Sequence, residues 1–358
     1  MPIMLVSSVL STPALRSIIA AGNNHSLYME DVDTLFASGA NDSGQLASTP
    51  APSLPSPVRI SASNIKQVVC GADHTVILYT DGTVHTFGKN TNGQLGDGTY
   101  IDRATPTPID IDQVKAVACG VNHTLFLKED GSLRSCGYNY FGQLGDGSVS
   151  DRNAPTNVLI TGVVANMAAG GSHTVFLMAD GTVKACGYNM FGQLADGTTT
   201  NSQTVVDSLP TNVKQLDCGG SHSAFLYTDG TVKTCGFNAQ GQLGAGLTAF
   251  SSAVLSDTGL TSVKSVSCGT LHTMFVTTSR KLYAAGDNRY GKLGDGTTTK
   301  RISPVLIPIN NVIKVSAGSQ HTLTLGADGT VRSQGYNAFG QLATGDLTNR
   351  STPTVSMF

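Results

Sequence analysis

The chain is poor in charged residues and contains no tryptophan. Charged side chains make up 13% of its 358 residues, the formal net charge is −2, and glutamate occurs only as Glu30 and Glu129. The sequence has no basic tail and no run of like charges. Proteins that bind nucleic acids or anionic membranes usually carry clustered positive charge. We therefore expect no nucleic-acid partner.

Long apolar runs are missing as well. No stretch approaches the ~20 apolar residues that cross a bilayer, so we expect no membrane insertion. The N-terminal MPIMLVSSVLSTPALR lacks the basic start of a signal peptide, because its first basic residue is Arg16. We interpret it as a β-strand. The seven cysteines are odd in number, so at least one is free, which favours a cytoplasmic or other intracellular setting.

Enzyme signatures are also lacking. The chain has no Gly-x-Ser-x-Gly, His-Glu-x-x-His, Cys-x-x-Cys or phosphate-loop motif. Its Asp-Gly-Thr tripeptides lack the alternating acidic spacing of a calcium loop. We therefore expect a protein that is not an enzyme, with no catalytic residues, metal or cofactor.

What the chain does have is glycine and a repeat. Its 41 glycines and 13 prolines disfavour long helices. A Gly-x-x-His-Ser/Thr element recurs in steps of 49 or 50 residues, and Asn-x-x-Gly-Gln-Leu follows it in the same register. The histidines are His25, His74, His123, His173, His222, His272 and His321. The glutamines are Gln45, Gln94, Gln143, Gln193, Gln242 and Gln341, with Lys292 in the remaining copy. Two markers in one register indicate seven copies of one unit.

Each copy contains four short strand patterns. Over residues 57–106 they are PVRISA, QVVCG, HTVILY and TVHTFG, and the last two flank Asp81-Gly82, a strong hairpin signal. Four short strands per repeat are typical of a propeller blade. The sequence therefore predicts an all-β fold: residues 1–358 form a single seven-bladed β-propeller with four-stranded antiparallel blades.

Connection lengths suggest an order of strands within a blade. Only the link after TVHTFG is long, so we expect it to run from the outermost strand of one blade to the innermost of the next, the proline-led strand. The Gly-x-x-His turns and the long crossovers then share one face of the disc, opposite the Asp-Gly turns. Both MPIMLVSSVL and TPTVSMF resemble the proline-led strand. We expect TPTVSMF to close the ring by pairing across the seam.

The motif resembles a known family. Gly-x-x-His-Ser/Thr, Asp-Gly-Thr-Val and a glycine-rich crossover such as GYNYFGQLGDG together resemble the regulator of chromosome condensation repeat over essentially the whole chain. The resemblance implies a seven-bladed propeller. The founding nuclear exchange factor of that family carries a basic tail and a wedge insertion against its small GTPase. Here the steps differ by only one residue, which leaves no room for such a wedge and disfavours guanine-nucleotide exchange.

Most repeated residues have a structural interpretation. We expect each histidine to tie its turn to the crossover loop through a ring nitrogen, since buried polar groups need partners. In the crossover, Asn and Gly supply positive-φ positions, Gln bonds loop backbone, and Leu fills the blade junction. The cysteines are expected to be small buried hydrophobes without disulfides. Asp217 is a lone acid on its strand, which we interpret as a satisfied core aspartate.

The positions that vary between copies are the candidates for function. Aromatic residues and one methionine occupy variable crossover positions, and such residues are enriched at protein interfaces. They are Tyr138, Tyr140, Phe141, Tyr188, Met190, Phe191, Phe237, Tyr290 and Phe339. Packing on the adjoining crossover explains them equally well. Our preferred hypothesis is a non-catalytic scaffold that binds a protein partner through the crossover face. The alternatives are nucleotide exchange on a small GTPase and a structural role in a virion or other large assembly.

Overall fold

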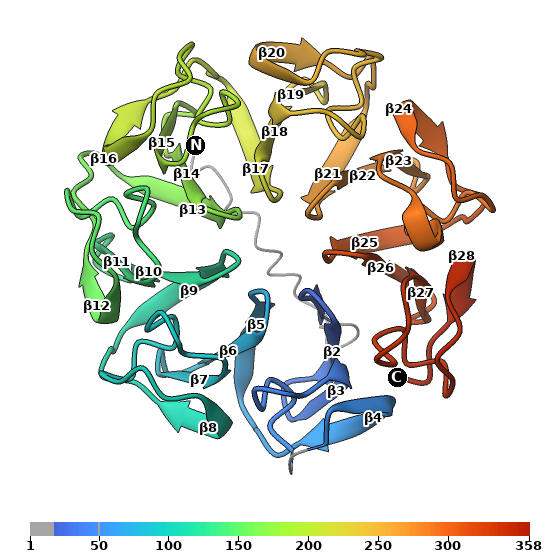
Figure 1. Ribbon diagram of the computed structural model, residues 1–358, viewed down its shortest axis with the longest axis horizontal. Coiled ribbons are helices and arrows are strands. Elements are labelled where there is room, and N and C mark those ends of the chain that lie inside the picture. Colours follow the sequence, from blue (N-terminus) through green and yellow to red (C-terminus); the bar gives the residue numbers. More distant parts are fainter. Residues whose placement is uncertain (1–17, 49–50) are drawn as a thin grey trace.

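The computed structural model describes residues 18–48 and 51–358, and these form a ring of seven four-stranded antiparallel sheets (Figure 1). This confirms the predicted fold class. Each sheet uses four consecutive strands of the chain, and we number the blades 1 to 7 in chain order. The described residues contain one short 3₁₀ turn, η1 (Arg289–Gly291), and no helix with the length and hydropathy of a membrane span. The strand proposed for MPIMLVSSVL lies outside the described residues.

The first and second strands of each blade are joined by the Gly-x-x-His turn. The first strands surround the axis of the ring (Figure 1). They are β1 (Ile18–Ala21), β5 (Ile65–Cys70), β9 (Val114–Cys119), β13 (Val164–Ala169), β17 (Val213–Cys218), β21 (Val263–Cys268) and β25 (Val312–Ala317). The second strands are β2 (His25–Asp31), β6 (His74–Tyr79), β10 (His123–Lys128), β14 (His173–Met178), β18 (His222–Tyr227), β22 (His272–Thr277) and β26 (His321–Gly326).

The third and fourth strands are joined by the long crossover loop. The third strands are β3 (Thr34–Ala40), β7 (Val84–Gly88), β11 (Leu133–Gly137), β15 (Val183–Gly187), β19 (Val232–Phe237), β23 (Leu282–Gly286) and β27 (Val331–Gly335). The fourth strands form the outer rim (Figure 1). They are β4 (Ser53–Ile60), β8 (Arg103–Pro108), β12 (Arg152–Asn157), β16 (Ser202–Asp207), β20 (Ser251–Asp257), β24 (Arg301–Leu306) and β28 (Arg350–Val355).

This order corrects the predicted arrangement of strands. The proline-led strand is outermost rather than innermost, and the long crossover stays within one blade instead of joining two. Proline suits an outer edge because that edge needs no N–H donor. The innermost segments instead hydrogen-bond from blade to blade, as Ala72 N does to Val121 O at 3.0 Å. The predicted faces hold, since the first and third turns of an antiparallel blade share one side.

The ring closes without exchanging a strand. The first four residues of TPTVSMF belong to strand β28, which completes blade 7, but this strand pairs with β27 of its own blade. The prediction that it pairs across the seam is therefore wrong. Blades 7 and 1 meet through the contacts found at other junctions: Ser319 N donates to Gly22 O at 3.1 Å, and the Ser26 hydroxyl donates to Gln341 O at 2.7 Å.

The core consists of the junctions between blades. Successive residues of β6 serve different junctions: Ile77 packs with Phe87, whereas Val76 and Leu78 pack with Phe126 of blade 3. Because both faces of each sheet are covered, the second strands are buried along almost their whole length rather than at alternate residues. The crossover and Gly-x-x-His turns are left on one face of the disc, where function was expected.

Candidate interaction face

At every blade junction one side-chain hydroxyl accepts a hydrogen bond from a histidine ring and donates one to a carbonyl of the crossover loop. At the junction of blades 2 and 3, the Thr124 hydroxyl donates to the Gln94 carbonyl at 2.7 Å and contacts His74 Nε2 at 3.0 Å. Because the hydroxyl proton is used on the carbonyl, Nε2 is the donor to the hydroxyl. The hydroxyls are Ser26, Thr75, Thr124, Thr174, Ser223, Thr273 and Thr322. Each histidine is therefore linked to the crossover loop of its own blade through a hydroxyl of the next blade, and not by the direct hydrogen bond that was expected.

The histidine rings are buried and neutral. Burial lowers the pKa of His25 to about 4 and that of His74 to about 3. The rings stand one per blade around the disc, and each packs over the glycine that begins its own turn. In this position the rings have no contact with solvent. Their geometry supports a structural function and offers no catalytic base.

The crossover loop is held by its own side chains. In blade 3, Asn139 Nδ2 donates to Asp146 at 3.1 Å, and its Oδ1 accepts from Leu144 N at 3.0 Å. The Gln143 side chain accepts from Phe141 N at 3.1 Å, and Leu144 is fully buried. In this loop Gly142, Gly145 and Gly147 have positive φ, whereas Asn139 does not. The expectation that Asn supplies a positive φ was wrong. Its side-chain amide holds the loop through hydrogen bonds instead.

Lys292, which stands where other copies have glutamine, is also structural. Its ammonium group is fully buried, forms an ion pair with Asp287 and donates to the side chain of Gln320. Asp287 occupies the position that is aromatic in blades 3, 4, 5 and 7. The blade has therefore exchanged an aromatic residue for the counter-ion that a buried lysine requires.

Asp217 bonds two blades together at the centre of the ring. Its carboxylate accepts from Cys218 N at 2.9 Å and from Cys268 N of the next blade at 2.8 Å. Burial raises the pKa of this carboxyl to about 6, and the two backbone N–H groups lower it in part. Ser267 does the same for Ala317 N at 3.0 Å. Asp217 thus serves as a backbone acceptor.

The cysteines form no disulfide, as predicted. All seven are free, and five of them are buried. Burial raises the pKa of the Cys136 thiol well above its usual value. Among the described residues, no group of three His, Cys, Asp or Glu side chains is placed to hold a metal ion.

The aromatic residues of blades 3 to 5 form one continuous chain of ring contacts. Tyr140 and Phe141 lie 5.0 Å apart between ring centroids, and Phe141 meets Tyr188 of the next blade at 4.7 Å. Phe191 meets Phe237 at 4.9 Å, again across a junction. We call this set the aromatic arc; its members are Tyr138, Tyr140, Phe141, Tyr188, Phe191, Phe237 and Phe250.

The arc is partly packed and partly open. Tyr140 is 65% exposed and Phe250 60%, and Met190, which lies between them in sequence, is 58% exposed. The other members are half-buried against one another. Packing on the adjoining crossover therefore explains the half-buried rings, whereas Tyr140, Met190 and Phe250 remain exposed.

Few charges accompany the arc. Between its third and fourth strands, blade 4 carries Asp196 as the sole charged residue, and blade 5 carries none. The neighbouring Gly-x-x-His turns of these blades read Gly-Gly-Ser. Blade 3 carries Asp146, which forms an ion pair with Arg152, and Asp151, so the arc is an aromatic surface with few charges on the crossover face.

Two predicted residues lie elsewhere. Tyr290 contacts Tyr336 at 4.7 Å, and Tyr336 contacts Phe339 at 6.2 Å, so these three form a second cluster on blades 6 and 7. No ring contact joins them to the arc within the described part of the chain.

Phe250 was missed from the sequence, although a signal for it exists. In blades 2 and 3 the equivalent residues are Asp102 and Asp151, whose carboxylates accept from Asn90 N and Asn139 N. In blade 5 the backbone carbonyl of Phe250 accepts from Asn238 N at 2.7 Å instead. The side chain of Phe250 is therefore not used to hold the loop. In the sequence, the signal for such a residue is the absence of Asp or Asn at this position of the repeat.

Sequence comparison places these observations in a family. The RCC1-like domain model matches residues 4–255, and models of the regulator of chromosome condensation (RCC1) repeat match residues 281–325, 263–292 and 312–341. The chain belongs to the RCC1-like domain family. No curated protein sequence matches it significantly.

Solved RCC1-like structures are similar throughout the ring. The human protein WBSCR16 is 28% identical, with a TM-score of 0.78 over 87% of this chain and 88% of its own. Prp20p from Saccharomyces cerevisiae is 20% identical and was described with its binding properties to Gsp1p and histones. Its TM-score is 0.81, and the match covers 90% of this chain and 85% of Prp20p. The structure of yeast RCC1 (Prp20) bound to Kap60 has a TM-score of 0.80 at 18% identity. The match covers 100% of this chain and 91% of the yeast chain.

Proposed function

We propose that this RCC1-like propeller is a non-catalytic scaffold that binds a protein partner through the crossover face of blades 3 to 5. The observation that carries the proposal is the aromatic arc with its two exposed members, Tyr140 and Phe250, together with the exposed Met190 of the blade 4 crossover. Large apolar side chains gathered on a surface, with few charges among them, are typical of the centre of a protein interface. The fold itself does not require them, since blade 2 has Thr91 and Asn92 in the same loop.

Three further points support this function. The repeated histidines are neutral, buried and occupied with hydroxyls, so they provide no catalytic group. The relative Prp20p is described with protein partners, Gsp1p and histones. The seven free thiols agree with a reducing, intracellular setting for the encounter.

The experiment is affinity purification with the triple variant Tyr140→Ser, Met190→Ser, Phe250→Ser. All three side chains are exposed, so the ring should fold and melt as the wild type does. The matched control is Tyr100→Ser, Ile101→Ser in blade 2, whose side chains are 50% and 63% exposed in the same type of loop. We expect the arc variant to lose its stoichiometric partner and the control to retain it.

Two outcomes would replace this proposal. Capture of an unchanged partner set by the arc variant would remove blades 3 to 5 from consideration. Acceleration of nucleotide release from a small GTPase, unaffected by the arc variant, would favour the exchange function instead; the structural similarity to Prp20p is what motivates that arm.

A further inference from the structure

On the face opposite the arc, one blade carries positive charge in a turn where the other blades carry negative charge. The turns between second and third strands carry an exposed aspartate in the other six blades: Asp31, Asp81, Asp130, Asp180, Asp229 and Asp328. Each aspartate accepts from a backbone N–H two residues on, as Asp81 does from Thr83 at 2.9 Å. In blade 6 the turn reads Ser279-Arg280-Lys281. Two cations therefore replace one anion.

The turn of blade 6 keeps its shape despite this change. Arg280 N donates to Thr277 O at 2.9 Å, as Gly230 N does to Tyr227 O at 3.0 Å in blade 5. The Thr277 hydroxyl accepts from Lys281 N at 3.1 Å and so takes over the bond that aspartate makes elsewhere. Arg280 nevertheless has φ of 61°, where blades 2, 3, 4, 5 and 7 have glycine. A left-handed arginine is less stable than glycine here, so the turn does not explain the residue.

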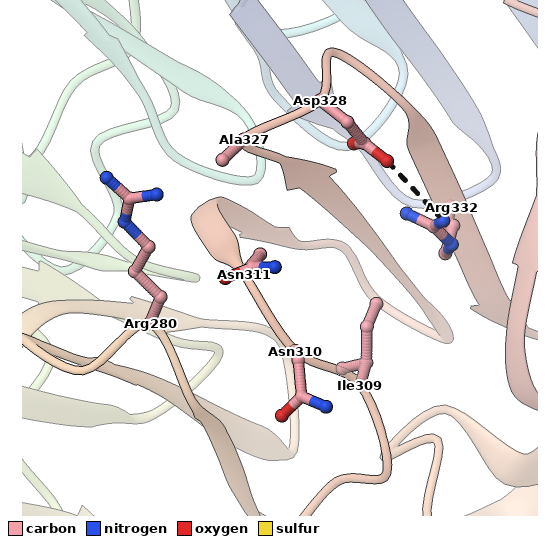
Figure 2. A pocket seen from close by; sticks show the side chains of 7 residues that line it. All are labelled: Arg280, Ile309, Asn310, Asn311, Ala327, Asp328 and Arg332. Atoms are coloured by element: carbon pink, nitrogen blue, oxygen red, sulfur yellow. Dashed lines mark ion pairs between the residues drawn. The ribbon is translucent and has the colours of Figure 1, made fainter.

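Arg280 lines a cavity between blades 6 and 7. The cavity has a volume of about 470 Å³ and is lined by Arg280, Ile309, Asn310, Asn311, Ala327, Asp328 and Arg332. Figure 2 shows Arg280 on one side, Arg332 beside Asp328 on the other, and the two asparagines between them. Among the described residues, the guanidinium of Arg280 has no hydrogen-bond partner.

Arg332 is also incompletely paired. Its nearest carboxylate oxygen, on Asp328, lies 3.9 Å away, beyond hydrogen-bond distance. In blade 4 the equivalent Lys184 lies opposite Asp207 on the fourth strand and forms an ion pair with it. In blade 7 the residue opposite Arg332 is Val355, which has no charge to offer. The cavity therefore holds two guanidinium groups with open donors and a single carboxylate.

We propose that this cavity binds a carboxylate side chain from an acidic peptide segment of a protein partner. Guanidinium groups bind carboxylates through paired N–H donors, and the amides of Asn310 and Asn311 add donors between them. The aspartates on the other turns repel an extended polyanion such as nucleic acid, so only a short acidic segment fits. The cavity lies on the face opposite the aromatic arc, and the proposal is independent of the arc's function.

The test is fluorescence anisotropy of a labelled glutamate-rich peptide at low and at physiological ionic strength. We expect binding that salt weakens, no binding of the glutamine version, and at least a tenfold loss in both Arg280→Gly and Arg332→Ala. Arg280→Gly restores the residue of the other turns, so its melting temperature should equal or exceed that of the wild type. The matched control is Arg134→Ala, the same strand position in blade 3, which should bind normally.

Several results would overturn the assignment. They are failure of the wild type to bind the glutamate peptide, an equal loss in Arg134→Ala, or unchanged binding by Arg280→Gly. Tighter binding of a phosphoserine peptide than of the glutamate peptide would assign the cavity to phosphate instead. The arc variant should bind the peptide as the wild type does, which separates this test from that of the proposed function.

Discussion

A single hydroxyl at each junction satisfies two buried groups from two neighbouring segments. Replacing Thr124 by valine keeps the shape but leaves His74 Nε2–H without a partner and leaves the Gln94 carbonyl only the weak thiol donor of Cys136. We expect a loss of about 2–4 kcal/mol in the free energy of unfolding. Thr124→Ser should cost less than about 1 kcal/mol, because Ser26 and Ser223 occupy this position in other blades. Urea unfolding of the two variants checks this, and equal losses would contradict it.

Asp217 gives stability a pH dependence of its own. Its pKa is raised in the folded state to about 6, so the folded protein holds this proton more tightly than the unfolded chain. The stabilising contribution is complete below the unfolded pKa of about 4 and is lost as pH rises through about 6. In Asp217→Ser this dependence disappears. The difference in unfolding free energy between variant and wild type should shift by about 1 kcal/mol between pH 5.5 and 8. A constant difference over that range would contradict the buried acid.

Individual residues were predictable where they recur. The spacing identified His74 and Gln94, and it indicated buried structural roles. It could not identify the partner, because the hydroxyl that receives His74 belongs to the next copy, 50 residues further along the chain. Lys292 was visible as a departure from the repeat, but only the fold shows that it meets Asp287.

At the scale of elements, the crossover loop depends on a close approach between blades. Gly142 has φ of 84°, and a Cβ there would overlap the Cα of Gln203 on the fourth strand of the next blade. Gly131 has a similar φ of 83° but nothing within 4 Å of a Cβ. We expect Gly142→Ala to cost about 3 kcal/mol or more and Gly131→Ala about 1 kcal/mol. Thermal melts of both variants measure the difference, and similar melting temperatures would show that the approach is unimportant.

The order of strands shows why an element can be predicted and still be misplaced. All four strand patterns of the repeat were evident, but their radial order was inferred from the length of the crossover. That loop is long because it covers the face of a junction, with Leu144 buried beneath it. The prolines of the fourth strand were the better guide, since they mark an edge.

The whole ring should be sensitive to acid. Seven buried histidines have their pKa values lowered, for example to about 4 for His25 and about 3 for His74, whereas the unfolded value is 6.5. Unfolded chains bind more protons in this window, so stability is complete above about pH 6.5 and falls below it. At pH 5.5 each histidine costs roughly 1 kcal/mol, so the seven together remove much of a typical stability of about 5–15 kcal/mol.

Denaturant unfolding followed by circular dichroism at pH 7.5 and 5.5 tests this sensitivity. We expect a much lower midpoint at the acid pH, with proton uptake on unfolding. The effect of Asp217 on stability has the opposite pH dependence and offsets only a small part of the loss caused by the histidines. Equal midpoints at the two pH values would contradict the burial of neutral rings.

Seven blades and the RCC1-like family could be predicted from the repeat alone. The interaction face could be predicted only in part, because variable positions do not reveal which side chains meet across a junction. The arc joins residues of three blades and includes Phe250, whereas Tyr290 and Phe339 belong to a separate cluster. Contacts between neighbouring copies decide this, and they arise from closure of the whole molecule.

Oxidative footprinting of the protein with and without its captured partner tests the central claim most directly. Met190 on the crossover face and Met357 at the end of blade 7 are almost equally exposed, at 58% and 59%, so each serves as the reference for the other. We predict that the partner protects Met190, Tyr140 and Phe250 from oxidation and leaves Met357 as reactive as before. Protection of Met357 with no change at Met190 would contradict a partner surface on blades 3 to 5.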